Sequence, residues 1–243
     1  STGTQPRHMS TALGVDWASG CWVVVAVDDD GTTITTEPAM LNVLYEYDDA
    51  EPILVDIPIG LPETPGRACD EAAAARLGER HGSVFAVPCR AAVDADDYEA
   101  AREANGGSLG SQSWGLVPRI REVDRVLDAC DAAARVYESH PEVCYATFAE
   151  RIGHGPLGSK RDDDGLDARL SVLEAVDPSV GAAVRSFVDD RRDGAAWHRR
   201  IRAGRLDDVL DAAVLAVTAR RGSFGVLPEG RESSDDQVIV YPG

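Results

Sequence analysis

The chain has 243 residues, 44% of them hydrophobic, and is therefore long enough to bury a full core. Its apolar stretches all fall short of the roughly 18 residues that a bilayer crossing needs, so we expect no membrane partner. A formal net charge of -18 at pH 7 would ordinarily argue against a nucleic-acid partner, because phosphate binding rests on basic residues.

The charged residue types occur in unequal numbers: 27 Asp and 15 Glu accompany 23 Arg and a single lysine, Lys160. This skew resembles that of proteins from salt-in halophiles, whose acidic surfaces keep them hydrated. In molar salt the Debye length is about 3 Å, so overall repulsion is screened and only local contacts count. The net charge therefore says little about the substrate.

Five cysteines, at positions 21, 69, 89, 130 and 144, are an odd number and show no metal-ligand spacing. We therefore expect no zinc site and a reduced, cytoplasmic compartment. Residues 1–8, which precede Met9, lack the apolar segment of a signal peptide, and we interpret them as a vector-derived tail. Residues 9–243 are expected to form a single domain.

Three strands joined by tight turns open the predicted fold, at 13–17, 21–27 and 32–36. Pro38 begins a helix to about Tyr47, which leads to a fourth strand at 52–57. Because this strand is reached through a helical crossover, we expect it to run parallel to the first.

A helical insertion is predicted at about 67–134, between the fourth strand and a fifth at 135–139. Its helices are expected at 67–78, 94–104 and 111–134, with Pro118 bending the last or marking its start, and 83–88 as a short extended segment. A loop at 153–165 precedes helices at about 166–176, 179–190 and 205–220 and a final strand at 237–241. This order predicts a ribonuclease H-like α/β fold: a mixed five-stranded sheet, antiparallel then parallel, flanked by helices.

The segment 51–67 carries the strongest functional signal. Ile53, Leu54 and Val55 form an apolar strand that Asp56 interrupts just before Pro58 ends it. A carboxylate at the edge of a core is costly unless a cation or backbone donors satisfy it. Asp56 is therefore either part of a functional site or a cap of the following turn.

Three further aspartates are placed where this fold would bring them to Asp56. Asp16 lies in the first strand, and Asp208 and Asp211 are three residues apart on one face of a helix. Such carboxylates cannot all stay ionised without a cation between them, and Mg²⁺ or Mn²⁺ suits oxygen ligands. Two such ions about 4 Å apart would support phosphodiester hydrolysis. The alternative for each aspartate is a helix or turn cap, or an acidic surface residue.

Several motifs also resemble the domain-of-unknown-function family number 429, described as predicted ribonuclease H-like nucleases. They run through most of the chain: GVDWA at 14–18, VDIPIGLP at 55–62, RACDEAAAARLG at 67–78, SVFAVPCR at 83–90, SHPEV at 139–143, the Lys160 loop, DDVLDA at 207–212 and VIVYP at 238–242. The helix carrying Asp208 and Asp211 is also similar to the last catalytic helix of bacterial Holliday-junction resolvases. The resemblance implies the fold and a nuclease activity. Trp17 departs from the family pattern and is expected to narrow access to Asp16.

The resemblance implies further polar site residues. Arg67, Asp70 and Arg76 share one helix, and Arg90, His140, Glu142 and Lys160 lie on loops near strand ends. The arginines are expected to clamp a phosphate, and Glu142 to bind metal or to orient an arginine. The alternative for Arg67 and Asp70 is an ordinary pair on a helix surface. Lys160 is expected in the same cleft as the aspartates and to take part in catalysis.

A basic stretch at 191–205 contains six arginines and Trp197. It either binds nucleic acid or neutralises acidic clusters at 162–164 and 189–190 on the same molecule.

The leading hypothesis is a metal-dependent nuclease. A second hypothesis, an ATP-dependent phosphotransferase, would need two duplicated lobes, for which the chain is too short. A third is a non-catalytic protein that binds nucleic acid or nucleotide and keeps the fold. The sequence leaves open DNA or RNA as substrate, and the oligomeric state.

Overall fold

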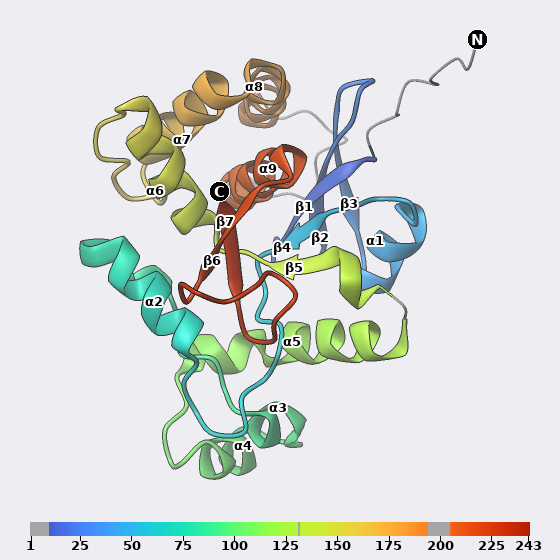
Figure 1. The fold of residues 1–243 in the computed structure, drawn as a ribbon, viewed down its shortest axis with the longest axis vertical. Coiled ribbons are helices and arrows are strands. Elements are labelled where there is room, and N and C mark those ends of the chain that lie inside the picture. Colours follow the sequence, from blue (N-terminus) through green and yellow to red (C-terminus); the bar gives the residue numbers. More distant parts are fainter. Residues whose placement is uncertain (1–9, 131, 194–204) are drawn as a thin grey trace.

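A computed structural model describes residues 10–130, 132–193 and 205–243. Its main sheet has the strand order β3-β2-β1-β4-β5 (Figure 1). The strands are β1 (Ala12–Trp17), β2 (Trp22–Val27), β3 (Thr32–Glu37), β4 (Ile53–Val55) and β5 (Val136–Glu138). The first three are antiparallel neighbours, β4 runs parallel to β1, and β5 runs parallel to β4. The predicted ribonuclease H-like topology is confirmed.

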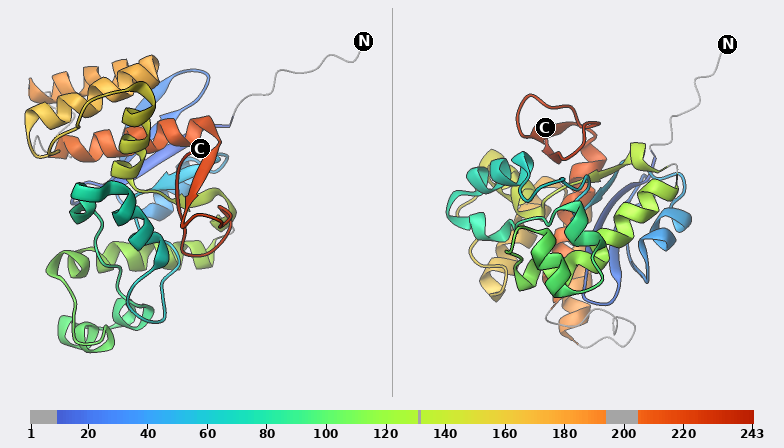
Figure 2. Two further views of the ribbon diagram at one scale, coloured as in Figure 1. Left: turned by 60° about the vertical axis from the view of Figure 1, so that its left-hand side comes forward. Right: turned by 90° about the horizontal axis from the view of Figure 1, so that it is seen from below.

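Helices cover both faces of this sheet (Figures 1 and 2). One face packs against α6 (Pro141–Ile152), α7 (Asp163–Val176), α8 (Pro178–Arg192) and α9 (Leu206–Arg221). The other face packs against α1 (Met40–Glu46) and α5 (Ser111–Ala129). Side chains alternate along β1, so Leu13 and Val15 join the α1–α5 side while Ala12 joins the α9 side. Asp16 therefore projects from the face that α9 covers.

Helix α9 lies directly on β1 because Gly14 has no side chain. A Cβ atom at Gly14 would fall 1.9 Å from the Ala212 carbonyl oxygen and 2.3 Å from the Ala216 amide nitrogen. The small side chains of α9 at this point complete the close approach. Gly14 is two residues before Asp16, so the same contact brings the acidic start of α9 to the carboxyl end of β1.

The inserted helices differ from the predicted ones in their bounds. They are α2 (Ala68–Leu77), the 3₁₀ helix η1 (Gly78–Ser83), α3 (Arg90–Asp94), α4 (Tyr98–Ala104) and α5. The helix predicted at 94–104 is present but begins only at Tyr98, because Asp97 caps its start, its side chain accepting from the Ala100 amide. Helix α5 begins at Ser111 and passes through Pro118, and residues 84–89 form no strand.

Helix α6 and strand β6 (Phe224–Leu227) are among the elements absent from the sequence-based prediction. Helix α6 begins at Pro141, and most of its residues are buried. Strand β6 pairs antiparallel with β7 (Ile239–Pro242), the predicted final strand. Gly225 breaks the apolar run of β6 because the ring of Tyr241 packs against it. This hairpin joins the edge of the main sheet through a bridge between Ser139 and Val240.

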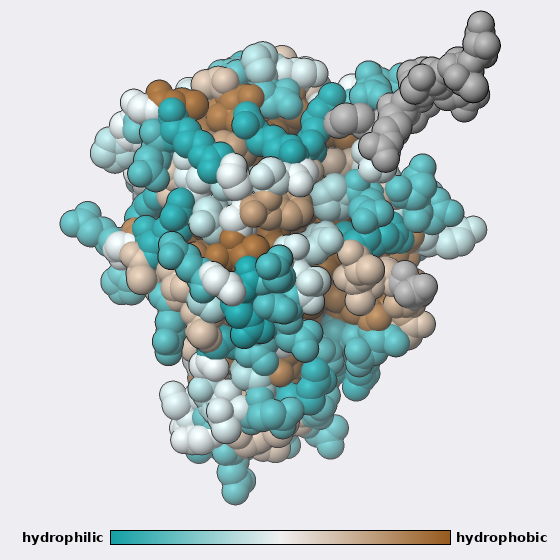
Figure 3. All heavy atoms as spheres, in the orientation of Figure 1, coloured by the Kyte–Doolittle hydropathy of each residue, from teal (hydrophilic) through white to brown (hydrophobic). Residues whose placement is uncertain are grey.

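Hydrophilic residues cover most of the face shown in Figure 3, with hydrophobic residues between them in small groups. Within the described ranges, no helix is both long enough and apolar enough to pass through a bilayer. The tail predicted at 1–8 and most of the basic stretch, including Trp197, lie outside the described residues.

Candidate metal centre

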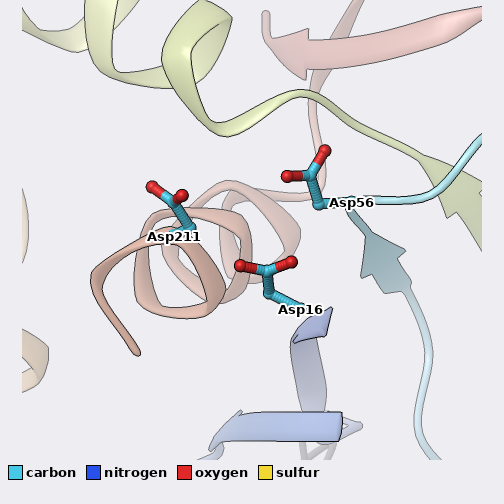
Figure 4. A group of neighbouring side chains, drawn as sticks. All are labelled: Asp16, Asp56 and Asp211. Atoms are coloured by element: carbon cyan, nitrogen blue, oxygen red, sulfur yellow. The ribbon is translucent and has the colours of Figure 1, made fainter. Parts of the chain in front are cut away.

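Three aspartates converge at the carboxyl end of the parallel strands (Figure 4). Asp16 is the penultimate residue of β1, Asp56 directly follows β4, and Asp211 projects from α9. Each offers a carboxylate oxygen, and these oxygens lie within 4.8 Å of one another. The spacing is short enough for a single cation to contact all three. The expected convergence of strand-end and helix carboxylates is therefore present for these three residues.

Burial and mutual repulsion act on Asp16 and Asp211. Their exposed fractions are 7% and 1%. Burial raises the pKa of Asp16 well above its usual value, and the charges of Asp56 and Asp211 raise it further. Burial also raises the pKa of Asp211, although the ammonium group of Lys160 opposes the shift. Without a metal ion, burial and mutual repulsion therefore destabilise the ionised forms of both groups.

Burial and neighbouring charges also raise the pKa values of Asp56 and Asp208. Burial, followed by the charge of Asp211, raises the pKa of Asp56 to about 8. Burial, followed by the charge of Asp16, raises the pKa of Asp208 to about 9. Asp208 therefore belongs to the same electrostatic cluster, although it is not among the three residues that share the 4.8 Å spacing. A bound divalent cation would reverse all four shifts.

Unsatisfied oxygens support the fit to a cation. Asp208 Oδ2 and Asp211 Oδ1 are buried and have no hydrogen-bond partner among the described residues. The Trp17 amide donates to Asp16 Oδ1 at 2.6 Å, which fixes this carboxylate. Buried carboxylate oxygens without donors are costly, and all-oxygen sets of this kind suit Mg²⁺ or Mn²⁺. The donor set therefore fits the expected metal.

Lys160 reaches the cluster from the loop between α6 and α7. Its Nζ donates to Asp211 Oδ2 at 2.6 Å and lies 3.9 Å from Asp207 Oδ2. Burial lowers the pKa of Lys160, but the charge and hydrogen bond of Asp211 outweigh this effect and raise the pKa overall. Lys160 is therefore charged, and the expectation that it points into the aspartate cleft agrees with this contact.

Arg67 lies beneath the centre rather than in it. It is 2% exposed, and its guanidinium donates to both oxygens of Asp70, both oxygens of Glu138 and the Ile59 carbonyl. All five donors are thus engaged within the protein, and none remains for the phosphate clamp expected from the sequence. Glu138 also accepts from the Ile59 amide at 2.7 Å. This network braces the loop that follows Asp56.

Glu142 forms a second buried network. Arg169 donates to both of its carboxylate oxygens at 2.9 Å, and Arg80 donates to one of them at 2.7 Å. The remaining hydrogen bonds of Arg169 go to backbone carbonyls at Leu157, Gly158 and Gly165. Glu142 therefore orients an arginine, one of the two roles expected for it, and Arg169 ties down the loop that carries Lys160.

The other expected site residues make contacts within the protein. Arg76 donates to Thr147 Oγ1 at 3.0 Å and covers the ring of Tyr241 at 4.6 Å. Arg90 pairs with both oxygens of Asp124 in α5, and its side chain remains 40% exposed. His140 contacts the Ser83 carbonyl at 3.3 Å, its Nδ1 is buried without a partner among the described residues, and burial lowers its pKa.

Trp17 does not narrow the cleft in the expected way. Its side chain packs with Trp22 in the cluster on the α1–α5 side of the sheet, and Arg119 covers its ring at 4.3 Å. Strand alternation explains the difference, because neighbouring residues of β1 point to opposite faces. Asp16 and Trp17 therefore belong to different sides of the molecule.

The described ends of the basic stretch contact acidic residues of the same chain. Arg192 lies 3.6 Å from both Asp163 and Asp167, and Arg205 Nε lies 3.7 Å from Asp208 Oδ2. The contact of Arg192 with Asp163 agrees with the interpretation that the stretch neutralises the acidic cluster at 162–164, whereas Asp167 and Asp208 lie outside both of the clusters named for it.

Glu138 and Arg169 were missed by the sequence analysis, although each left a signal, and Arg80 was missed as well. Glu138 is a charged residue in a short buried strand, the same kind of interruption that marks Asp56. Arg169 stands in α7 one residue before Leu170 and three after Leu166, inside the apolar stripe of the helix. A charge at a core-facing position is costly without a partner, so both positions indicate buried ion pairs.

The sheet order and the aspartates together define a ribonuclease H-like α/β protein with a candidate metal centre. The chain belongs to the family described as "Protein of unknown function (DUF429)", which matches residues 14–233. Comparison with curated proteins and with solved structures gave no match.

Proposed function

We propose that this protein is a divalent-metal-dependent nuclease that hydrolyses phosphodiester bonds in DNA or RNA. The observation that carries the proposal is the convergence of three aspartate carboxylates within 4.8 Å, on the face of the sheet where α9 meets β1. The buried oxygen Asp211 Oδ1, which has no hydrogen-bond partner among the described residues, supports it, because a buried carboxylate oxygen is costly without a donor or a cation.

Asp16, Asp56 and Asp211 would hold Mg²⁺ or Mn²⁺, with Asp208 contributing charge or a further ligand. Such an ion supplies Lewis acidity, which lowers the pKa of a coordinated water and stabilises the leaving oxygen. The chain fixes the ligands before substrate arrives, since the Trp17 amide holds Asp16 and the Glu138–Arg67 network holds the loop after Asp56. The site is preorganised in this sense.

Lys160 provides the positive charge that a phosphodiester needs near the centre. Its ammonium group already touches Asp211, and its side chain remains 37% exposed. A phosphate entering beside Asp211 would meet a donor of matching charge. Arg90 is the other expected substrate-binding residue whose side chain stays substantially exposed while paired.

Four of the five cysteines are buried. Their odd number and their lack of metal-ligand spacing support a reducing compartment, and we propose a cytoplasmic location. The acidic composition favours function in concentrated salt, so activity should be measured in molar KCl.

The direct test is a panel of single-stranded, duplex and branched DNA and RNA, incubated with Mg²⁺ or Mn²⁺ in molar KCl. We expect cleavage of at least one substrate, loss of cleavage with chelator, and a fall of several orders of magnitude in Asp211→Asn. Lys160→Arg should lower the rate because a planar guanidinium cannot replace the compact ammonium beside Asp211. Arg102→Met, at an exposed ion pair with Glu99, is the matched surface control.

If the protein binds a nucleic acid without cleaving it, and Asp211→Asn binds equally well, the nuclease proposal is contradicted. That result would support the non-catalytic alternative. If neither Mn²⁺ nor nucleic acid binds, both the nuclease proposal and the non-catalytic alternative are contradicted.

A further inference from the structure

The ammonium group of Lys160 already holds one carboxylate oxygen of the acidic cluster, at a position where a metal ion could otherwise bind. Its Nζ lies 2.6 Å from Asp211 Oδ2, and the second oxygen of the same carboxylate, Oδ1, has no partner among the described residues. The two oxygens of Asp211 therefore differ: Oδ2 is held by the ammonium group of Lys160, and Oδ1 is left open for a metal ion.

Two metal ions held about 4 Å apart need a bridging carboxylate that gives one oxygen to each ion. In Asp211 the ammonium group of Lys160 holds one of the two oxygens, so a second ion could use that oxygen only by displacing the ammonium group. The Trp17 amide donates to Asp16 Oδ1 at 2.6 Å and fixes the orientation of that carboxylate. One oxygen each of Asp16, Asp56 and Asp211 lies within 4.8 Å of the others, which makes one compact set of ligands.

The charge balance leads to the same number of ions. Four buried or half-buried carboxylates contribute to the cluster: Asp16, Asp56, Asp208 and Asp211. Lys160 and Arg205 lie within ion-pair distance of Asp211 and Asp208 and offset two of these charges. One divalent ion offsets the remaining two. Asp207, 20% exposed, lies at the outer side of Lys160, 3.9 Å from its Nζ.

The loop carrying Lys160 is fixed by the rest of the fold. Arg169, anchored on Glu142, donates to the carbonyl oxygens of Leu157, Gly158 and Gly165 on either side of Lys160. Gly165 is in turn pressed against the loop, because a Cβ atom there would lie 1.8 Å from the Ser159 carbonyl oxygen. The ammonium group is therefore held at Asp211 by its own backbone as well as by its charge.

We propose that Lys160 stands in the place of a second metal ion, so that the centre binds one divalent cation per chain. The inference rests on the proposed metal site and goes beyond it by fixing the number of ions and the role of the lysine. A second ion beside Asp211 Oδ2 would have to displace the ammonium group and would meet its charge at short range.

The test is a calorimetric titration of the chelator-treated protein with Mn²⁺ in molar KCl, followed by electron paramagnetic resonance of the loaded protein. The wild-type protein should bind one Mn²⁺ and give the spectrum of an isolated ion. Lys160→Met, which keeps the length of the side chain and removes its charge, should bind two and show coupling between them. Arg102→Met should behave like the wild-type protein.

The wild-type titration decides the question even if Lys160→Met fails to fold. Two coupled ions in the wild-type protein would overturn this inference while leaving the nuclease proposal intact. A single ion in a folded Lys160→Met variant would also overturn it, since the position vacated by the ammonium would then not be a cation site. No bound Mn²⁺ in the wild-type protein would instead overturn the metal site on which both proposals rest.

Discussion

At the scale of single residues, the position of Asp56 separates its two interpretations. A turn cap would accept hydrogen bonds from the backbone amides that follow it. No such bond to the Asp56 carboxylate is present among the described residues, whereas the Ile59 amide donates to Glu138 instead. The loop after β4 is thus stabilised by a different carboxylate, and Asp56 is left to face Asp16 and Asp211.

The metal-free protein should lose stability as the pH rises. The pKa values of Asp56 and Asp208 are raised to about 8 and about 9 in the folded state, from an ordinary value near 4. Between these limits the folded state binds more protons than the unfolded state, so the free energy of unfolding falls as the pH increases. Thermal melts with chelator at pH 5, 7 and 9 should show a falling melting temperature. A rise across this range would contradict the raised pKa values.

Asp56→Asn should remove part of that pH dependence. The amide has the shape of the protonated carboxyl group and cannot ionise, so the metal-free variant should exceed the wild-type protein in stability by about 1 kcal/mol or more at pH 7. The difference should nearly vanish at pH 3, where the unfolded carboxyl group, with an ordinary pKa near 4, is also largely protonated. If Asp56 only capped a turn, stability would barely change at any pH, because Asn caps nearly as well. Melting curves of both proteins at the two pH values distinguish these outcomes.

Most residues of the cluster could be predicted from the sequence, because a charge that interrupts an apolar run is visible without a structure. Asp16, Asp56 and Asp211 carry this signal, and Lys160 is marked by composition. The partners of Arg67 could not be predicted, because a pairing with Glu138 across 71 positions depends on how β5 and α2 pack. The same limit applies to Arg169 and Glu142, which are joined only in the folded chain.

At the scale of elements, the contact of α9 with β1 determines whether the cluster forms. Strand alternation and helix spacing fix which way each aspartate points, but the distance between them depends on how closely the helix approaches the strand. Gly14 sets that distance, since even a Cβ atom at this position would overlap the backbone of α9. The sequence motif around Asp16 therefore combines a ligand with the packing site that brings the other ligands near.

Gly14→Ala should impair both folding and metal binding. The added methyl group must push α9 away from β1, which should lower the free energy of unfolding by about 1–3 kcal/mol or more. Affinity for Mn²⁺ should also fall, because Asp211 moves with the helix away from Asp16. Urea denaturation and calorimetric titration measure the two effects.

Gly115→Ala is the matched control for this substitution. No atom lies within 4 Å of a Cβ built at Gly115, which lies within helix α5, so alanine there should leave Mn²⁺ binding unchanged and stability equal or slightly higher. Equal Mn²⁺ affinity in Gly14→Ala and the wild-type protein would contradict the view that this contact positions the ligands.

Element boundaries show where prediction from the sequence fails. The sheet order could be predicted because tight turns and a helical crossover leave few topologies for its five strands. Helix α6 was missed, although Pro141 at its start is an ordinary signal of a helix N-terminus. Strand β6 is short and contains Gly225, so only its pairing with β7 defines it.

At the scale of the whole molecule, the net charge of -18 acts on stability through repulsion between like charges. Salt screens this repulsion, with a Debye length that falls from about 10 Å at 0.1 M to about 3 Å at 1 M. We therefore expect the melting temperature of the metal-free protein to rise between 0.1 M and 2 M KCl. A fall over this range would show that specific ion pairs outweigh the overall repulsion.

The account depends most on a cation bound between three aspartates, and anomalous scattering from crystals grown with Mn²⁺ tests this directly. We predict one anomalous peak per chain, surrounded by oxygens of Asp16, Asp56 and Asp211, with metal–oxygen distances of roughly 2.0–2.3 Å. The ammonium group of Lys160 should remain on Asp211. A well-ordered site without an anomalous peak at millimolar Mn²⁺, or peaks confined to acidic residues elsewhere on the surface, would contradict the account.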